Sequence, residues 1–219
     1  MGKKSPERSA ADYLPPRLSL ASLRRAADGC EGCDLYKNAT QTVFGAGPRR
    51  AKLLFLGEMP GDAEDLAGQP FVGPAGRLFD RVLAAIGLAR DEVYITNAVK
   101  HFRWEPRGKR RLHKRPDAGH IEACRPWLQA EILLVKPPLV VCLGATAAQT
   151  LLGRTFRITR SRGQVVETAD GLRCLATYHP AAILRAPDEN RKHMHKEFVD
   201  DLQTAAASLN RSPRHRQPK

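Results

Sequence analysis

The chain has 219 residues, and its 36 Lys and Arg outnumber its 23 Asp and Glu, which gives a net charge of +13 and a pI of about 10.0. This length suits one domain with a sizeable core, and the charge favours a polyanionic partner, nucleic acid rather than membrane. No run of about 18 apolar residues and no secretory signal is present, so we expect a cytoplasmic protein without a membrane partner.

The two ends of the chain differ in composition from its middle. Residues 1–16 are polar and contain proline, and residues 209–219 are basic. Such segments bury too little apolar surface to fold, so we predict two disordered tails around a single domain over residues 17–208.

Apolar periodicity predicts that strands alternate with helices between these tails. In chain order we expect a strand over 51–57, a helix from Pro74 to about Leu88, a strand over 93–99, a helix over about 117–135, a strand over 139–144, a helix over 145–152, a hairpin of 164–168 with 172–177, and a helix over about 189–208. This alternation is typical of a mostly parallel sheet covered on both faces. We therefore predict an α/β fold, a three-layer α/β/α sandwich around a mostly parallel four-stranded sheet.

Residues 107–115 carry six Lys and Arg side chains, no acid and one histidine, His113. They follow the strand that contains Asn97 near its end, so a cationic loop is predicted over the carboxyl end of the sheet, where α/β proteins place their sites. Charge alone attracts phosphate without specifying chemistry, and a solvated face stays open as an alternative. The histidine is the residue that can add chemistry.

A glycine-rich turn over residues 57–62 leaves the first strand, and residues 71–76 open the next helix. Glycines allow the backbone to approach a ligand, and a helix start offers free N–H groups to an anion. Glu58, Asp62 and Phe71 favour a binding site here over a plain turn. The Gly-Lys-Ser/Thr ending of a P-loop is absent, which argues against a nucleoside triphosphate site.

His179 follows the strand over residues 172–178. A histidine at the carboxyl end of a strand can polarise a substrate oxygen. A capped surface histidine before a proline turn is the alternative.

Cys30 and Cys33 form a two-residue-spaced pair, and Cys124 lies on a predicted helix. Five cysteines in a chain without a secretory signal indicate thiols or metal ligands rather than disulfides. The pair does not lie in the strand-to-helix turn of a thioredoxin-like unit, so a redox motif is disfavoured. Zinc and an iron–sulfur cluster both stay open.

A metal held by three cysteines needs a fourth ligand, for which His101 and Cys142 are the candidates. Cys142 lies within an apolar strand, where a free cysteine behaves as a small hydrophobe. His101 follows a strand in a loop and can reach a metal more easily, so we favour it. Cys174 is predicted to pack in the core.

The chain contains six ordered motifs: Gly57-Glu-Met-Pro-Gly61, Phe71-Val-Gly-Pro-Ala-Gly-Arg77, Asn97-Ala-Val-Lys100, Cys124-Arg-Pro-Trp-Leu128, Leu143-Gly-Ala-Thr-Ala-Ala148 and His179-Pro180. Together they resemble the iron–sulfur (family 4) uracil-DNA glycosylases over roughly residues 30–208. The basic insertion Lys109–His113 resembles the signature of the UdgX branch, whose members become covalently attached to uracil-containing DNA.

This resemblance implies uracil excision from DNA, preferably single-stranded, by a monomer with a structural [4Fe-4S] cluster. The implied cluster ligands are Cys30, Cys33, His101 and Cys124. In the implied site Phe71 stacks on uracil, Asn97 pairs with its Watson–Crick edge and His179 donates a hydrogen bond to its O2. The turn that lines this site is expected to contribute Gly57, Met59, Gly61 and Asp62.

The same resemblance implies that His113 bonds to the sugar C1′ and that Glu58 orients the imidazole. Phosphates are expected to be bound by Lys109, Arg110, Arg111, Lys114 and Arg185. Met59 stands where the branch usually has Gln, which removes an amide beside Glu58. Two other functions stay open: a conventional multiple-turnover glycosylase, and a noncatalytic iron–sulfur module that binds DNA.

Overall fold

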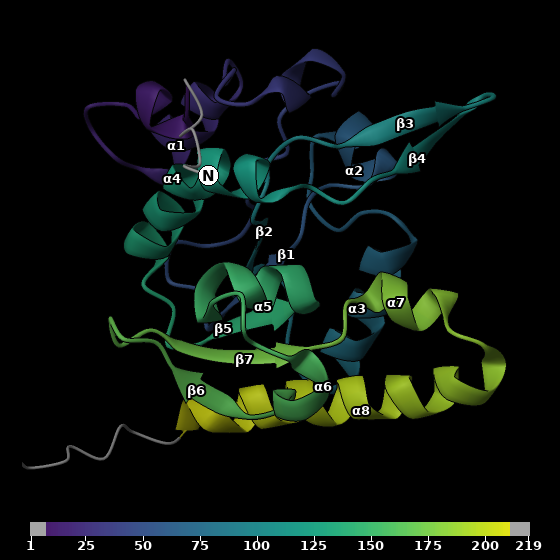
Figure 1. Cartoon of the computed structure of the whole chain (residues 1–219). Helices are drawn as coiled ribbons and strands as arrows, with labels where there is room; N and C mark the ends of the chain where they lie inside the picture. The colour runs from purple at the N-terminus through teal and green to yellow at the C-terminus, as the bar shows by residue number, and fades with distance from the viewer. Residues whose placement is uncertain (1–7, 211–219) are drawn as a thin grey trace, which may run out of the picture.

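The computed structural model describes residues 8–210, in which a five-stranded sheet has the order β2-β1-β5-β7-β6 (Figure 1). The strands are β1 (Leu53–Gly57), β2 (Val93–Asn97), β5 (Val140–Leu143), β6 (Val165–Glu167) and β7 (Arg173–Thr177). β1, β2, β5 and β7 run parallel, and the short edge strand β6 pairs antiparallel with β7. The sheet therefore has one strand more than expected, because the short partner of the predicted hairpin joins it.

Helices cover both faces of the sheet, which confirms the three-layer α/β architecture. Side chains alternate along a strand, so Leu53 and Phe55 of β1 pack on one face against α3 (Pro74–Ala85) and α8 (Asp188–Ala207). Leu54 and Leu56 pack on the other face with α4 (Ala118–Val135) and α5 (Ala145–Leu152). Two apolar clusters on either side of one sheet thus hold the carboxyl ends of its strands in fixed positions.

A third apolar cluster, called the N-terminal cluster below, joins the N-terminal segment to α4. The segment contains η1 (Ala10–Tyr13), α1 (Leu20–Ala27) and η2 (Asp34–Lys37), and Ala10 is buried in the cluster beside Trp127 of α4. The folded part therefore begins within the expected tail of residues 1–16, and η4 (Ser208–Asn210) extends it at the other end. The remaining tail residues, 1–7 and 211–219, lie outside the described part of the chain.

The long helices begin and end close to the predicted positions. Asp117 caps α4 by accepting from the backbone N–H of His120, and Lys136 ends the helix in the left-handed conformation before Pro137. The remaining helices are short: α2 (Asp62–Ala67), η3 (Arg90–Glu92), α6 (Ile158–Ser161) and α7 (Pro180–Arg185). Over residues 8–210, no helix has both the length and the apolar content needed to cross a membrane.

The basic segment is a β-hairpin, so the prediction of a loop was wrong. β3 (Trp104–Arg107) pairs antiparallel with β4 (Arg110–His113), and the hairpin projects beside the sheet (Figure 1). Its two-residue turn starts at Gly108, which has a φ of +57° that suits glycine. The two strands, Trp-Glu-Pro-Arg and Arg-Arg-Leu-His, combine charged residues with a proline and lack the apolar alternation from which strands are predicted, which explains the error.

Candidate active site

The carboxyl ends of β1, β2 and β7 meet at one edge of the sheet and bring the predicted site residues together. Gly57 ends β1, Asn97 ends β2 opposite it in the register, and His179 follows β7. The hairpin brings His113 to the same edge, where its imidazole lies 3.8 Å from the Glu58 carboxylate. Residues far apart in the sequence thus form one site because parallel strands end on the same side.

Asn97 carries a buried amide oxygen without a partner. The residue is 2% exposed, and its Oδ1 is the buried side-chain acceptor within residues 8–210 that has no hydrogen bond. A Cβ at Gly57 would lie 2.2 Å from this oxygen and 2.9 Å from the Phe71 ring, so glycine is required there. A buried unpaired acceptor is costly, and at a strand end it marks a place for a ligand that donates a hydrogen bond.

Phe71 is held in a strained backbone conformation. Its φ is +56°, a region that residues other than glycine seldom occupy. A Cβ at Gly76 would meet the Phe71 carbonyl oxygen at 1.8 Å, so glycine at this position permits the conformation. The Phe71 ring lies with its centroid 5.6 Å from that of His179 and can offer a flat surface to a planar ligand.

His179 is fixed in one tautomer by the start of α7. Its Nδ1 accepts the backbone N–H of Ala181 at 3.1 Å, which leaves Nε2 to carry the proton of the neutral ring. Burial, Arg185 and His113 lower the pKa of His179 to about 4. The ring is therefore neutral near pH 7 and presents an Nε2–H donor to the site.

His113 is half-exposed and lies among charged groups of both signs. Burial lowers its pKa below the ordinary value of 6.5, Glu58 opposes this, and Arg185 and Arg115 reinforce it. The separation of 3.8 Å between His113 Nε2 and Glu58 Oε1 exceeds a hydrogen bond, so the carboxylate acts here through its charge. Phe102 packs beside the imidazole, with ring centroids 6.0 Å apart.

Arg115 was not among the residues predicted for the site. Its Nε lies 3.6 Å from Glu58 Oε2, and its Nη2 donates to Thr146 Oγ1 at 2.8 Å. Glu58 is thus flanked by an imidazole and a guanidinium. Arg115 ends the basic run, but the run alone gave no reason to separate it from its neighbours.

Arg111 anchors the hairpin instead of extending into solvent. Its guanidinium pairs with Asp62 and Asp65 of α2, at 2.6 Å each, and lies over the rings of Phe102 and Trp104. Arg111 and His113 are two residues apart in β4, so their side chains point to the same face of the strand. The ion pairs of Arg111 with α2, called the clamp below, therefore also determine where His113 lies.

Arg111→Met is expected to release the hairpin from α2 while leaving the sheet intact. The variant loses two ion pairs, one of them with the fully buried Asp65. Hydrogen exchange measured by mass spectrometry should be at least about tenfold faster in residues 104–113, because the loss of even ~1.4 kcal/mol of anchoring raises local opening that much. Arg110→Met, at an exposed position, is the matched control, and equal exchange in both variants would contradict the clamp.

The other predicted residues of the turn face away from the centre of the site. Met59 is buried in the N-terminal cluster with Val99 and Phe102, and Gly61 caps α2. Asp62 uses its carboxylate to hold Arg111. The structure thus gives Met59 and Asp62 contacts that support the site from outside.

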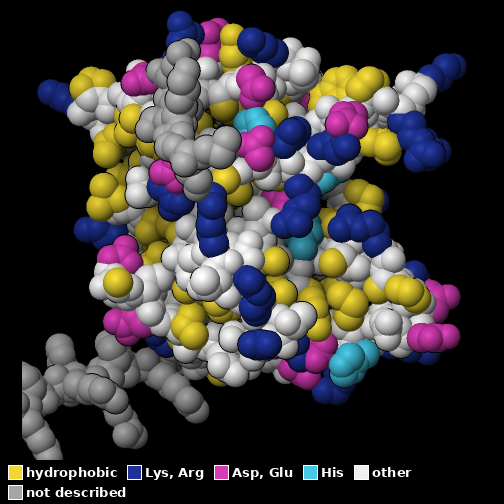
Figure 2. Space-filling model, viewed as in Figure 1, with side chains coloured by type: hydrophobic (Ala, Val, Ile, Leu, Met, Phe, Trp, Pro, Cys, Tyr) yellow, Lys and Arg dark blue, Asp and Glu magenta, His cyan; other side chains and the backbone are white. Residues whose placement is uncertain are grey.

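The remaining predicted cations differ in exposure and pairing. Lys109 and Arg110 are exposed at the tip of the hairpin, and Lys114 pairs with Glu105 at 2.9 Å. Arg185 ends α7 and lies close enough to lower the pKa of both site histidines. Figure 2 shows that Lys and Arg side chains surround exposed histidine side chains in the area between the projecting hairpin and α7. This face is therefore suited to a negatively charged backbone.

The three predicted cysteine ligands lie together in the N-terminal cluster. Trp127 Nε1 donates to Cys30 Sγ and the Lys100 backbone N–H donates to Cys124 Sγ, both at 3.3 Å. Burial raises the pKa of Cys33 to about 11, and the neighbouring Cys30 adds to this. No three His, Cys, Asp or Glu side chains in the described part of the chain converge closely enough for a single metal ion.

His101 has the tautomer that a metal ligand needs. The Thr42 hydroxyl donates its one hydrogen to the Ala27 carbonyl oxygen, so the contact of 2.9 Å with His101 Nε2 requires this nitrogen to be the donor. The lone pair is therefore on Nδ1. Cys30 and His101 both line a cavity of about 160 Å³.

Cys142 lies in a different apolar cluster from these thiols. It is fully buried in the cluster between the sheet, α4 and α5, and a hydrogen bond with Cys174 together with burial raises its pKa. The three cysteines of the N-terminal cluster lie together, and His101 lines a cavity with one of them, Cys30. This favours His101 over Cys142 as the fourth ligand.

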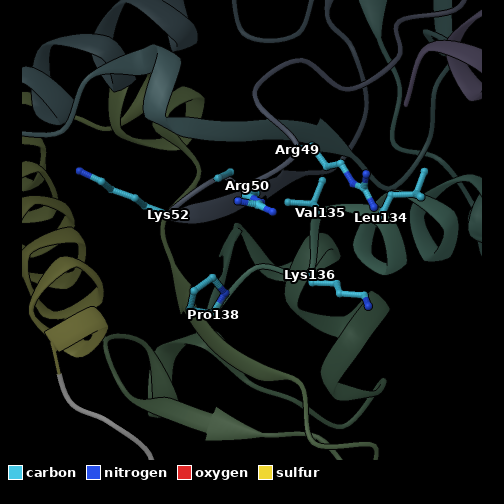
Figure 3. Close-up of a pocket in the computed structure, with 8 residues that line it drawn as sticks. Arg49, Arg50, Lys52, Leu134, Val135, Lys136 and Pro138 are labelled. Atoms are coloured by element: carbon cyan, nitrogen blue, oxygen red, sulfur yellow. The ribbon is translucent and has the colours of Figure 1, made fainter. Parts of the chain in front are cut away.

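A separate hollow of about 540 Å³ lies at the opposite edge of the sheet, before β1 and β5 begin (Figure 3). Four cations contribute to its lining: Arg49, Arg50, Lys52 and Lys136. None of the predicted site residues lines it, and its lining contains no carboxylate. The predicted site residues thus lie at the carboxyl edge and not in this hollow.

Comparison with known proteins agrees with this geometry. The sequence pattern of the uracil DNA glycosylase superfamily matches residues 44–203. A type-4 uracil-DNA glycosylase of Archaeoglobus fulgidus is 39% identical over 191 residues, covering 84% of this chain and 90% of the relative. Those of Thermotoga maritima and Pyrobaculum aerophilum are 35% and 34% identical, covering 82% and 84% of this chain and 89% and 92% of the relatives. The chain therefore belongs to the uracil-DNA glycosylase superfamily.

Proposed function

We propose that the protein excises uracil from DNA and that His113 then bonds covalently to the deoxyribose C1′, as in the UdgX branch. The observation that carries the covalent step is the position of His113. Its imidazole lies beside Glu58, at the edge where Asn97, Phe71 and His179 would hold the base. In a hydrolytic glycosylase a water molecule attacks the sugar. We propose that in this chain the His113 imidazole takes the place of that water.

Uracil reaches such a site only after it leaves the base stack, so single-stranded DNA is the preferred substrate. The unpartnered Oδ1 of Asn97 is suited to accept the uracil N3–H, and its Nδ2 can donate to O4. Phe71 would stack on the ring. These contacts distinguish uracil from cytosine, which carries no N3–H and has an amino group in place of O4.

Cleavage of the N-glycosidic bond moves its electron pair onto uracil and leaves positive charge on the sugar. The Nε2–H of neutral His179 is placed to donate to uracil O2 as this negative charge develops. The His113 imidazole lone pair then bonds to C1′. Glu58 stabilises the imidazolium that forms, and uracil takes up a proton from solvent.

An N-alkylated imidazolium is a poor leaving group, so the adduct is expected to be stable. The direct experiment incubates the protein with uracil-containing single-stranded DNA, heats it in detergent and separates the products on a denaturing gel. A retarded protein–DNA band supports the proposal. Free abasic DNA without such a band would instead establish a conventional multiple-turnover glycosylase, and absence of uracil release would leave only a DNA-binding module.

The rate of adduct formation is expected to decrease as the pH falls from 8, with a midpoint below 6.5, the ordinary pKa of histidine. Attack requires the neutral imidazole, and burial with the nearby arginines lowers the pKa of His113, so protonation removes the lone pair only at more acidic pH. Single-turnover rates across this range test it. In Arg185→Gln the decrease should begin at a higher pH, and a midpoint above 6.5 for the unmodified protein would contradict the assignment.

We also propose that Cys30, Cys33, Cys124 and His101 hold a [4Fe-4S] cluster, as the resemblance implies. The shared apolar cluster of the thiols, the free Nδ1 of His101 and the adjoining cavity support this donor set. Ligands of a four-iron cluster lie farther apart than those of one ion, so they need not converge as a single-ion site requires. Bound, the cluster would pin the N-terminal segment onto α4.

Purified protein is expected to contain about four irons per chain and to absorb visible light through thiolate-to-iron charge transfer. Cys124→Ala should abolish this absorbance, whereas Cys142→Ala should retain it because that thiol packs elsewhere. Bound zinc, or loss of iron from Cys142→Ala alone, would contradict the assignment.

The partner implied by these proposals is uracil-containing DNA bound by a monomer. The exposed cations at the hairpin tip, Lys109 and Arg110, and Arg185 of α7 would contact its phosphates. Noncovalent binding should therefore weaken steeply with salt.

A further inference from the structure

Lys100 and Glu131 form an ion pair in the interior, remote from solvent. The two side chains are 1% and 0% exposed, and Nζ lies 2.5 Å from Glu131 Oε2. Removing a charge from water is expensive, and a well-packed apolar pair of similar volume is often equally stable. Stability alone therefore gives little reason for this pair, and its hydrogen bonds indicate what it holds.

The lysine ammonium has an acceptor for each of its three protons. It donates to Glu131 Oε2, to Thr96 Oγ1 at 2.7 Å and to the backbone oxygen of Asn97 at 2.8 Å. Glu131 in turn accepts from Tyr94, from Thr96 and from the backbone N–H of Gly45. The network is complete and connects α4 to the end of β2.

This end of β2 is where the amide of Asn97 emerges. Beyond Asn97 the backbone N–H groups of Ala98 and Val99 donate to the carbonyl oxygens of Gly57 and Glu58, at 2.9 and 3.0 Å. These bonds join the two strand ends to each other but leave the Asn97 carbonyl to the lysine. The ammonium thus fixes the peptide group next to the side chain proposed to read uracil.

We infer that Lys100, held by Glu131, is a positioning residue that keeps the Asn97 amide in register with uracil. The inference rests on the proposed uracil excision and deepens it. Lys100 does not touch the substrate, so its effect must pass through Asn97. A displacement of ~1 Å at a positioned group can cost about 100-fold in rate.

The double variant Lys100→Met/Glu131→Gln tests this without leaving a lone buried charge. The amide introduced by Glu131→Gln retains an oxygen for Tyr94 and Gly45, and the fold is checked by thermal unfolding. Single-turnover uracil release should fall at least about tenfold, free uracil should bind more weakly by calorimetry, and affinity for uracil-free single-stranded DNA should be unchanged. Tyr94→Phe, which removes a contact to Glu131 alone, is the matched control and should release uracil at the unmodified rate.

The decisive comparison combines these changes with Asn97→Ala. If Lys100 acts through Asn97, the combined variant should release uracil no more slowly than Asn97→Ala alone. If the two changes act independently, their fold-losses in the rate of uracil release would multiply, and this result would overturn the inference. Uracil release at the unmodified rate by a folded double variant would also overturn it. Should the double variant not fold, Thr96→Val removes one Nζ acceptor, and the same non-additivity is required of it. If the unmodified protein neither binds nor releases uracil, the proposed function falls and the inference with it.

Discussion

Replacing His113 by alanine is expected to abolish the denaturant-resistant adduct and to convert the protein into a hydrolytic enzyme. The unmodified protein should release one uracil per molecule, because the imidazole that captures C1′ is consumed. Without the ring, the space beside Glu58 admits water, and this carboxylate, now 3.8 Å from the vacated Nε2 position, can accept the proton of the attacking water. Uracil release should then exceed one per protein molecule over hours.

The matched control is His193→Ala, an exposed histidine of α8 that lies outside the site. It should form the adduct at the unmodified rate and yield. An adduct that survives in His113→Ala would show that another group is the nucleophile. Loss of both adduct and uracil release would show that His113 is needed before capture.

Replacing Asn97 by alanine is expected to lower uracil release roughly 100-fold. The change removes an acceptor and a donor to the uracil edge, and two hydrogen bonds of about 1.5 kcal/mol each amount to a factor of that order. The folded protein should not lose stability, because Oδ1 has no partner to lose. Single-turnover uracil release and thermal unfolding, measured on the same preparation, check both expectations.

Asn190→Ala, an exposed position on α8, is the control for this series. Affinity for uracil-free DNA should be the same in both variants, since phosphate contacts come from other side chains. A normal rate of uracil release in Asn97→Ala would mean that the amide does not read the base, and the partnerless oxygen would need another explanation.

The residues at the strand ends could be predicted because each strand is recognised from a short apolar run of consecutive residues. Apolar runs identified β1, β2 and β7, and parallel strands must end at one edge, so Gly57, Asn97 and His179 converge. The buried network around Lys100 and Glu131 was not predicted. It depends on which helix covers which strand, and no residue spacing encodes that.

Side-chain direction accounts for most of the other differences. Met59 and Arg111 lie in segments that flank the candidate site, yet Met59 packs in the N-terminal cluster and Arg111 binds two carboxylates of α2. The hairpin itself was not predicted because charged residues and Pro106 interrupt the apolar alternation of its strands. Burial of Ala10 depends on contact with α4, which composition does not reveal.

The most direct test of the central claim is the mass of the protein after reaction with a uracil-containing oligonucleotide. The proposal predicts a species whose mass equals protein plus oligonucleotide minus one uracil, and fragmentation should place the sugar on the peptide that contains His113. An unmodified protein mass beside an abasic oligonucleotide, or a modification on any other residue, would contradict it.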